Sequence, residues 1–198
     1  KKKKIDDLTN HLNKIIERCF VPISAGGGVE SLDDAVRIIK SGADKIVLNS
    51  IFYKKTDIPK RIVQELGSQA VVASIDIKFL KNQYVLFSEN GKKKIDDSIK
   101  KHLDHLNNLK VGEIFVNSVD LEGTMLGPDG QLIKLIKENT DLPIIYSGGI
   151  GNYDHIKSIF QSFDINAVAC GSIFNFTDTN PIRLKSYLNS HKLNLRIF

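Results

Sequence analysis

The segment Val21–Phe52 constrains the possible fold more than any other part of the sequence. Val21–Ala25 is a short apolar run, and Gly26-Gly27-Gly28 follows at once. Apolar residues then recur at helical spacing, and a second apolar run, Lys45–Leu48, ends at Asn49-Ser50. This order is typical of a strand, a glycine-rich turn, a helix and a second strand. Because glycine lacks a Cβ atom, such a turn lets the backbone approach a ligand closely, and the helix N-terminus offers unpaired N–H groups to an anion.

The same unit occurs a second time, at Pro143–Phe174. Gly27-Gly28 corresponds to Gly148-Gly149, and Ser50-Ile51-Phe52 corresponds to Ser172-Ile173-Phe174. Two related units this far apart predict a duplicated α/β architecture with two similar anion sites. The alternative is that the two segments resemble each other only by chance, because all strand-turn-helix units share the same pattern.

The rest of the chain alternates strands with helices. Continuous apolar strands that alternate strictly with helices favour a parallel sheet. A hairpin around Lys81-Asn82-Gln83 and a polar, basic loop at Glu89–Lys94 interrupt the alternation. The predicted strands are Val21–Ala25, Lys45–Leu48, Gln69–Asp76, Tyr84–Phe87, Glu113–Asp120, 143–147 and 166–170; the predicted helices are 5–18, 29–41, 58–66, 96–109, 129–138, 153–162 and Pro181–Leu188.

Polar and glycine residues gather directly after the strands, as at the carboxyl-terminal face of a (β/α)8 TIM barrel. A typical barrel has about 250 residues, whereas this chain has 198. The shortfall equals roughly two βα units. The chain begins abruptly in a lysine run without Met. We therefore expect a single domain over residues 1–198 that is an N-terminally incomplete barrel, with about six of eight βα units and without the first two strands.

Composition excludes several classes of function. The net charge is +5, with lysines concentrated at Lys1–Lys4 and Lys92–Lys94, but Trp is absent and no nucleic-acid-binding motif occurs. Two basic clusters and two glycine turns suit a phosphorylated small-molecule substrate better. No apolar run approaches the length of a membrane span, and we expect no membrane partner. Cys19 and Cys170 are too few for a disulfide framework, which favours a cytoplasmic protein.

Two carboxylates are candidates for acid–base chemistry. Asp76 and Asp120 each follow a strand in a Ser-[Ile/Val]-Asp setting, and a carboxylate at a barrel mouth is well placed as a general acid or base. The alternative is that each carboxylate caps a loop or pairs with a lysine.

Two phosphate sites are predicted from the glycine turns. Gly28 with Asn49 and Ser50 forms one, and Gly149 with Gly171 and Ser172 forms the other, unless these glycines only form turns. For Lys92 and Lys93 two interpretations stay open: their side chains reach over a bound phosphate, or they belong to a solvated loop. The run Lys1–Lys4 is predicted to be the solvated start of a helix. The histidines show no metal-ligand spacing, and no metal or organic cofactor is predicted.

The chain resembles the cyclase subunit of imidazole glycerol phosphate synthase, the HisF family of histidine biosynthesis. The matching segments follow the family's order over nearly the whole chain: PISAGGGV, GADKIVLNS, GSQAVVASIDIK, NGKKK, VGEIFVNSVDLEGTMLGPD, LPIIYSGGIG, CGSIFNF and LKSYLNSHKLNLR. The resemblance implies a (β/α)8 barrel that takes ammonia from a HisH-like glutaminase partner docked on its N-terminal face. It also implies that a bisphosphate ribonucleotide intermediate is cyclised and cleaved to imidazole glycerol phosphate and an aminoimidazole carboxamide ribonucleotide.

The resemblance also implies roles for single residues. Asp76 matches one of two catalytic aspartates, and Asn117, Asp120 and Ser147 match substrate-pocket positions. Gly123 matches a position that helps the second phosphate site. Lys45 and Glu113 match charged residues that gate ammonia at the bottom of the barrel, and Asp44 matches a contact to the glutaminase.

Some positions depart from the family pattern. The second catalytic aspartate belongs to the family's first strand, which this chain does not contain. Lys94-Ile95-Asp96 stands where the histidine enzymes usually carry Asn-Thr-Gly, and SVDLEGT replaces SIDRDGT. ERCFVPISAGGG is closer to a paralogous branch that works with a glutaminase and an amidotransferase in acetamidino-sugar formation for surface polysaccharide. A non-catalytic phosphate-binding barrel fragment is the third alternative.

Overall fold

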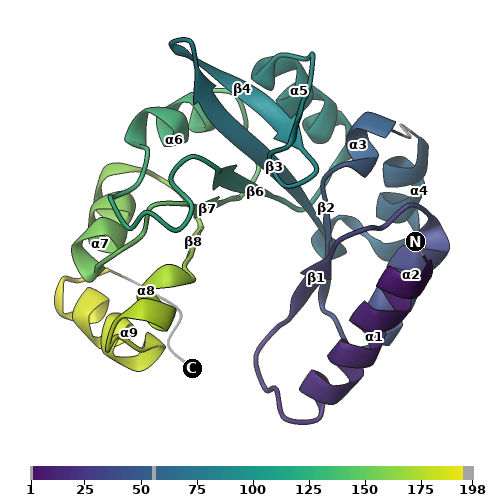
Figure 1. Cartoon of the computed structure of the whole chain (residues 1–198), viewed down its shortest axis with the longest axis horizontal. Helices are drawn as coiled ribbons and strands as arrows, with labels where there is room; N and C mark the ends of the chain where they lie inside the picture. The colour runs from purple at the N-terminus through teal and green to yellow at the C-terminus, as the bar shows by residue number, and fades with distance from the viewer. Residues whose placement is uncertain (1, 55–56, 194–198) are drawn as a thin grey trace.

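One curved sheet organises the chain. The computed structural model describes residues 2–54 and 57–193. Within them six strands run parallel in the order β1-β2-β3-β6-β7-β8, and β4 and β5 extend the sheet beyond β3. Helices surround the outer side of the curve (Figure 1). The fold is therefore α/β and consistent with part of a (β/α)8 barrel, and the described residues contain the six parallel strands that the sequence predicts.

The elements follow one another in the alternation that the sequence predicts. The strands are β1 (Ser24–Gly26), β2 (Lys45–Leu48), β3 (Val71–Leu80), β4 (Gln83–Ser88), β5 (Lys93–Lys94), β6 (Glu113–Ser118), β7 (Ile144–Ser147) and β8 (Ala167–Ala169). The helices are α1 (Lys2–Ile16), α2 (Leu32–Lys40), α3 (Ile51–Lys54), α4 (Asp57–Leu66), α5 (Ile99–Leu109), α6 (Gly130–Lys137), α7 (Tyr153–Ser162), α8 (Ser172–Phe176) and α9 (Pro181–Ser190), with a short 3-10 turn at Ser68–Ala70.

Polar side chains close the N-termini of most of the long helices. Ser31, Ser98, Asp129, Asn152 and Asn180 each accept a hydrogen bond from the backbone N–H three residues on. These residue types are favoured at this position because their short side chains satisfy an otherwise orphaned donor. Helix starts are therefore encoded locally, which explains why the sequence located them closely.

The core lies between the sheet and its helices. In β6 the side chains of Ile114, Val116 and Ser118 are buried, whereas Glu113, Phe115 and Asn117 on the other face are only partly covered. The strand register places Asp76, Asn117 and Ser147 in one row across three neighbouring strands. This row lies on the concave side, at the carboxyl ends of the parallel strands.

Three local predictions are corrected by the structure. The strand predicted to end at Asp76 begins later and continues to Leu80, because its second half pairs antiparallel with β4. The predicted hairpin exists, but the loop after it contains the short strand β5. Helices α3 and α8 have five residues or fewer and were not predicted. Lys1 and the end of the family-like segment LKSYLNSHKLNLR, residues 194–196, lie outside the described residues.

Candidate functional site

A cavity of about 1160 Å³ opens at the carboxyl ends of β1, β2, β3 and β6. It brings together five of the predicted site residues, which come from four separate segments: Gly28, Asn49, Ser50, Asp76 and Asn117. Parallel strands place their carboxyl ends at one edge of a sheet, where the sites of barrel enzymes form. The predicted acid–base carboxylate and one predicted phosphate turn therefore share a single cavity.

Asp76 is held by its neighbour on the next strand. Its side chain is 6% exposed, and its Oδ1 accepts a hydrogen bond from Asn117 Nδ2 at 3.2 Å. An amide donor orients a carboxylate without neutralising its charge. Asp76 is thus a fixed acceptor in the lining of the cavity.

Two amide oxygens in the same cavity have no partner within the described part of the chain. Asn49 Oδ1 and Asn117 Oδ1 are both buried, and neither receives a hydrogen bond there. Buried acceptors of this kind carry a free-energy cost unless a donor reaches them. Together with Asp76 they offer three acceptors to a ligand that carries N–H or O–H groups.

Lysines supply the positive charge of the cavity. Lys4, Lys54 and Lys92 line it, together with the acidic residues Glu30 and Glu89. Lys54 Nζ lies 2.9 Å from Glu89 Oε1, and this hydrogen bond lowers the pKa of the Glu89 carboxyl. The pair ties α3 to the loop between β4 and β5, at the wall of the cavity.

The first glycine turn has a backbone that glycine adopts easily. Gly27 and Gly28 have φ angles of 116° and 81°. A Cβ atom on Gly28 would lie 3.2 Å from Cδ of Lys4, so the aliphatic part of this lysine lies against the turn. The lysine run was predicted as a solvated helix start; the helix does begin there, but Lys4 also covers the predicted phosphate turn.

The residues of the second predicted phosphate site lie outside this cavity. Gly149 follows β7, and Gly171 and Ser172 follow β8, the neighbouring strand in the sheet. Gly123 lies in the loop after β6 with a φ of 77° and open space around it. Ser147 donates to Glu122 Oε2 at 3.4 Å. The strand order brings these residues to the same edge of the sheet as the cavity.

Asp120 lies apart from Asp76. Its Oδ2 accepts the backbone N–H of Phe79 at 2.7 Å, and it lines a smaller pocket of about 310 Å³ with Tyr84 and Leu132. The carboxylate therefore fastens the loop after β6 to the hairpin. This contact is of the loop-capping kind that the sequence left open, and a role of Asp120 in substrate binding stays a prediction.

The opposite end of the strands carries an ion pair. Lys45 Nζ at the start of β2 lies 2.7 Å from Glu113 Oε1 at the start of β6. Asp44 is exposed beside it, and its Oδ2 accepts the backbone N–H of Ile23 at 2.7 Å. All three residues predicted for the N-terminal face therefore lie at the end of the sheet away from the cavity.

Several residues of the site were missed by sequence reasoning. Ser74 and Lys54 line the cavity, and Tyr53 next to Lys54 donates or accepts a hydrogen bond with His102 Nε2 at 3.2 Å. Ser74 lies inside a predicted strand, and Tyr53 and Lys54 lie several residues after the predicted strand Lys45–Leu48, so their positions in the sequence gave no signal of a site. Within residues 2–54 and 57–193, no group of three His, Cys, Asp or Glu side chains is arranged to hold a metal ion. In the same ranges no helix has the length and apolar character needed to cross a membrane.

A known protein family matches most of the chain. The profile described as "Histidine biosynthesis protein" matches residues 1–180. The imidazole glycerol phosphate synthase subunit HisF of Prosthecochloris aestuarii is 33% identical over 184 residues, which is 93% of this chain and 73% of that protein.

Relatives from distant organisms give the same result. A putative imidazole glycerol phosphate synthase subunit HisF of Leptospira borgpetersenii is 34% identical over 90% of this chain and 71% of that protein. The corresponding subunit of Saccharolobus solfataricus is 32% identical over 89% of this chain and 70% of that protein. In each comparison the similarity therefore extends over most of this chain and most of the relative.

Proposed function

Since the chain belongs to the HisF family of histidine biosynthesis proteins, we propose that it acts as an ammonia-dependent cyclase and lyase. In the proposed reaction a bisphosphate ribonucleotide intermediate is converted to imidazole glycerol phosphate and an aminoimidazole carboxamide ribonucleotide. The observation that carries this proposal is the Asp76–Asn117 pair in a lysine-lined cavity. A carboxylate and two free amide oxygens suit a substrate rich in nitrogen, and the lysines suit its phosphate.

Asp76 has the role of general acid or base in this proposal. Its fixed carboxylate accepts a proton from the incoming nitrogen or returns one to the leaving group, which requires a heavy-atom distance near 3 Å in the complex. Asn117 keeps the carboxylate in place, and its free Oδ1 accepts a hydrogen bond from the substrate.

The two ends of the substrate bind at two turns. Gly28, Asn49 and Ser50, with Lys4, Lys54 and Lys92 around the cavity, receive one phosphate. Gly149, Gly171 and Ser172, with Gly123 nearby, receive the other. Two turns at one edge of the sheet fit a substrate with a phosphate at each end, and backbone N–H groups after strands are suited to such anions.

Ammonia arrives from the opposite face. The Lys45–Glu113 pair lies at that end of the strands, and in our proposal the separation of the two side chains admits ammonia from a HisH-like glutaminase subunit. Asp44, exposed on the same face, contacts that partner. The relatives are known as subunits of a synthase, which supports a partner of this kind.

The test is ammonia-dependent turnover of the bisphosphate ribonucleotide, followed by release of the carboxamide ribonucleotide. We expect Asp76→Asn to lower kcat by at least about 100-fold, the usual contribution of a general acid or base, while the phosphorylated substrate still binds. Asp141→Asn is the matched control, because the same chemical change is made at an exposed residue between α6 and β7. Equal turnover in both variants would remove Asp76 from the mechanism.

A second candidate is favoured by two loops that differ from the histidine enzymes. Lys94-Ile95-Asp96 folds back on β4, where the N–H of Ile95 donates to the carbonyl of Leu86 at 2.9 Å. Glu122 accepts the Ser147 hydroxyl. In this candidate the chain delivers ammonia, with a glutaminase and an amidotransferase, to an acetamido sugar of surface polysaccharide.

Neighbouring genes distinguish the two candidates: histidine-pathway genes support the first, and glycosyltransferase genes support the second. If neither substrate turns over although phosphate binds, the chain is a non-catalytic phosphate-binding protein.

A further inference from the structure

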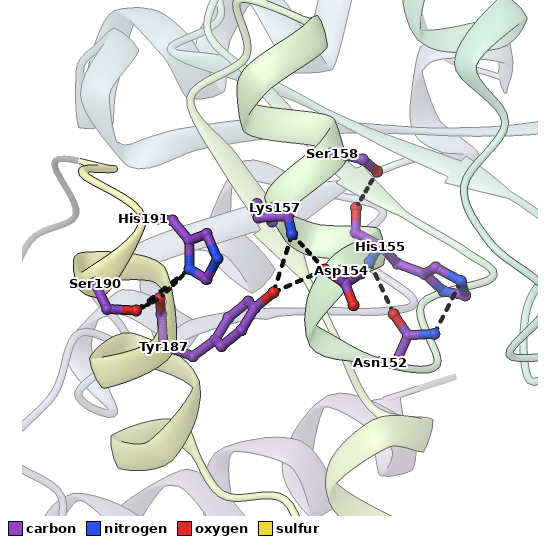
Figure 2. A network of polar contacts seen from close by, with 8 residues as sticks. All are labelled: Asn152, Asp154, His155, Lys157, Ser158, Tyr187, Ser190 and His191. Carbon is purple, nitrogen blue, oxygen red and sulfur yellow. Dashed lines mark hydrogen bonds and ion pairs between the residues drawn. The ribbon is translucent and has the colours of Figure 1, made fainter.

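The glycine turn after β7 is bound by a histidine that has no role in the proposal above. The backbone N–H of Gly151 donates to Nδ1 of His155 at 3.2 Å. His155 lies in the first turn of α7, and its own N–H donates to Oδ1 of the cap residue Asn152 at 2.9 Å. Figure 2 shows the imidazole turned toward Asn152, away from the separate cluster formed by Asp154, Lys157 and Tyr187. The side chain of His155 therefore belongs to the turn and not to the contact between α7 and α9.

The same ring also touches the loop that follows β6. A Cβ atom on Gly127 would lie 3.7 Å from Cε1 and Nε2 of His155. Gly127 in turn donates its N–H to the carbonyl of Gly149 at 2.8 Å. A Cβ atom on Gly149 would lie only 1.9 Å from the carbonyl oxygen of Gly127. The two loops thus pack backbone against backbone, and the imidazole supports both.

Two donors compete for the ring. A neutral imidazole has one acceptor nitrogen, but Gly151 N–H faces Nδ1 and Asn152 Nδ2 lies 3.1 Å from Nε2. The side chain of Asn152 is exposed and can turn to water, whereas the Gly151 peptide is half-buried. Because an unpaired buried donor costs more than an unpaired exposed one, the favoured tautomer carries its proton on Nε2 and accepts the Gly151 N–H at Nδ1.

We propose that His155 is a positioning residue for the second phosphate turn. By accepting the Gly151 N–H it fixes the peptide that ends the turn, and so sets the directions of the N–H groups at Gly148 and Gly149. These glycines have φ angles of 118° and 76°, and a glycine turn without such a tether has many conformations to lose on binding. This inference rests on the proposed function, which assigns Gly149, Gly171 and Ser172 to one substrate phosphate.

The test compares three variants of the full chain by NMR titration of ¹⁵N-labelled protein with inorganic phosphate. His155→Leu removes the acceptor but keeps an apolar side chain against Gly127. His155→Asn restores an acceptor near the place of Nδ1. Ser158→Ala is the control on the same helix, because its hydroxyl donates only to the carbonyl of His155. The amides of Gly149 and Ser172 report on the second turn, and the amide of Gly28 reports on the first.

We expect His155→Leu to weaken phosphate binding about tenfold at Gly149 and Ser172, the effect of losing one ordering hydrogen bond, with Gly28 unchanged. His155→Asn returns to within about twofold of the wild type, and Ser158→Ala matches the wild type. The inference is overturned if His155→Leu binds like the wild type, or if His155→Asn is as weak as His155→Leu. Absence of any phosphate response at Gly149 in the wild type would instead contradict the second phosphate site itself, and His155 would lose its role with it.

Discussion

The stability of this protein should fall on mild acidification because of one buried histidine. His102 on α5 is 2% exposed, and its Nε2 lies 3.2 Å from the Tyr53 hydroxyl. The two rings stack with centroids 4.8 Å apart. Burial, together with the neighbouring His105, lowers the pKa of His102 to about 4. The folded protein therefore keeps this imidazole neutral at a pH where the unfolded chain binds a proton.

The size of the effect follows from the two pKa values. The unfolded imidazole titrates near 6.5, so between that pH and about 4 the unfolded state holds more protons and stability falls as pH falls. Integrating the linkage relation gives a loss of about 2 kcal/mol between pH 7 and pH 5. That is a sizeable part of the 5–15 kcal/mol typical of a folded domain.

The assay is urea denaturation at several pH values between 7 and 5. His102→Phe keeps the stacking with Tyr53 but cannot be protonated, so we expect a constant cost of about 1 kcal/mol for the lost hydrogen bond and most of the pH dependence removed. His11→Gln is the control, because His11 is exposed, and it should keep the wild-type slope. The reasoning is refuted if wild type and His102→Phe lose the same stability between pH 7 and pH 5.

Three further predictions concern the site. Asn117→Leu removes the donor to Asp76 and the amide oxygen that we propose binds the substrate, so we expect kcat to fall about tenfold and KM to rise as well; steady-state kinetics with ammonium salts measures both, and an unchanged kcat would contradict the positioning role. Glu113→Gln leaves Lys45 without its counter-charge, and because the two side chains are 17% and 37% exposed we expect a cost of about 1 kcal/mol in urea denaturation; no measurable cost would show that the pair adds nothing to stability. In Gly149→Ala the new Cβ atom would lie 1.9 Å from the carbonyl oxygen of Gly127, at a φ of 76°, so we expect the free energy of unfolding to fall by more than about 2 kcal/mol. In Gly171→Ala the Cβ atom meets open space, and we expect a loss under about 0.5 kcal/mol. Equal losses in urea denaturation would refute the close packing of the two loops.

The sequence was sufficient wherever a signal is local. The unit from Val21 to Ser50 was predicted in the right order of strand, turn and helix, because apolar spacing, a capping Ser31 and consecutive glycines all act within a few residues. The strand itself begins only at Ser24, and Val21 is exposed. The hairpin that pairs Phe79 and Leu80 with the strand at Tyr84–Phe87 was predicted and is present. The unbroken continuation of β3 from Asp76 was missed, because Asp76–Leu80 mixes polar and apolar residues and becomes a strand by pairing with β4. Pairing partners that lie far along the chain leave no local pattern.

The same difference between local and long-range signals applies to the residues of the candidate site. Asp76 and the glycine turns were found because they follow apolar strands, and the structure places Asp76, Gly28 and Asn49 in one cavity. The Lys54–Glu89 pair spans a long stretch of sequence, and nothing near either residue indicates the other. Asp120 was indistinguishable from Asp76 by its setting, and tertiary contacts separate them: Asp120 accepts the Phe79 N–H, whereas Asp76 accepts the Asn117 amide. His155 carried no signal, because its acceptor role depends on the packing of two loops.

The most direct test of the proposed function is complementation of a histidine auxotroph that lacks the cyclase, with the gene that encodes this chain. We predict growth without histidine for the wild type and for Asp141→Asn, and no growth for Asp76→Asn at equal levels of soluble protein. Failure of the wild-type gene to support growth, with soluble protein confirmed, would contradict the histidine-pathway reaction and favour the sugar-modifying branch.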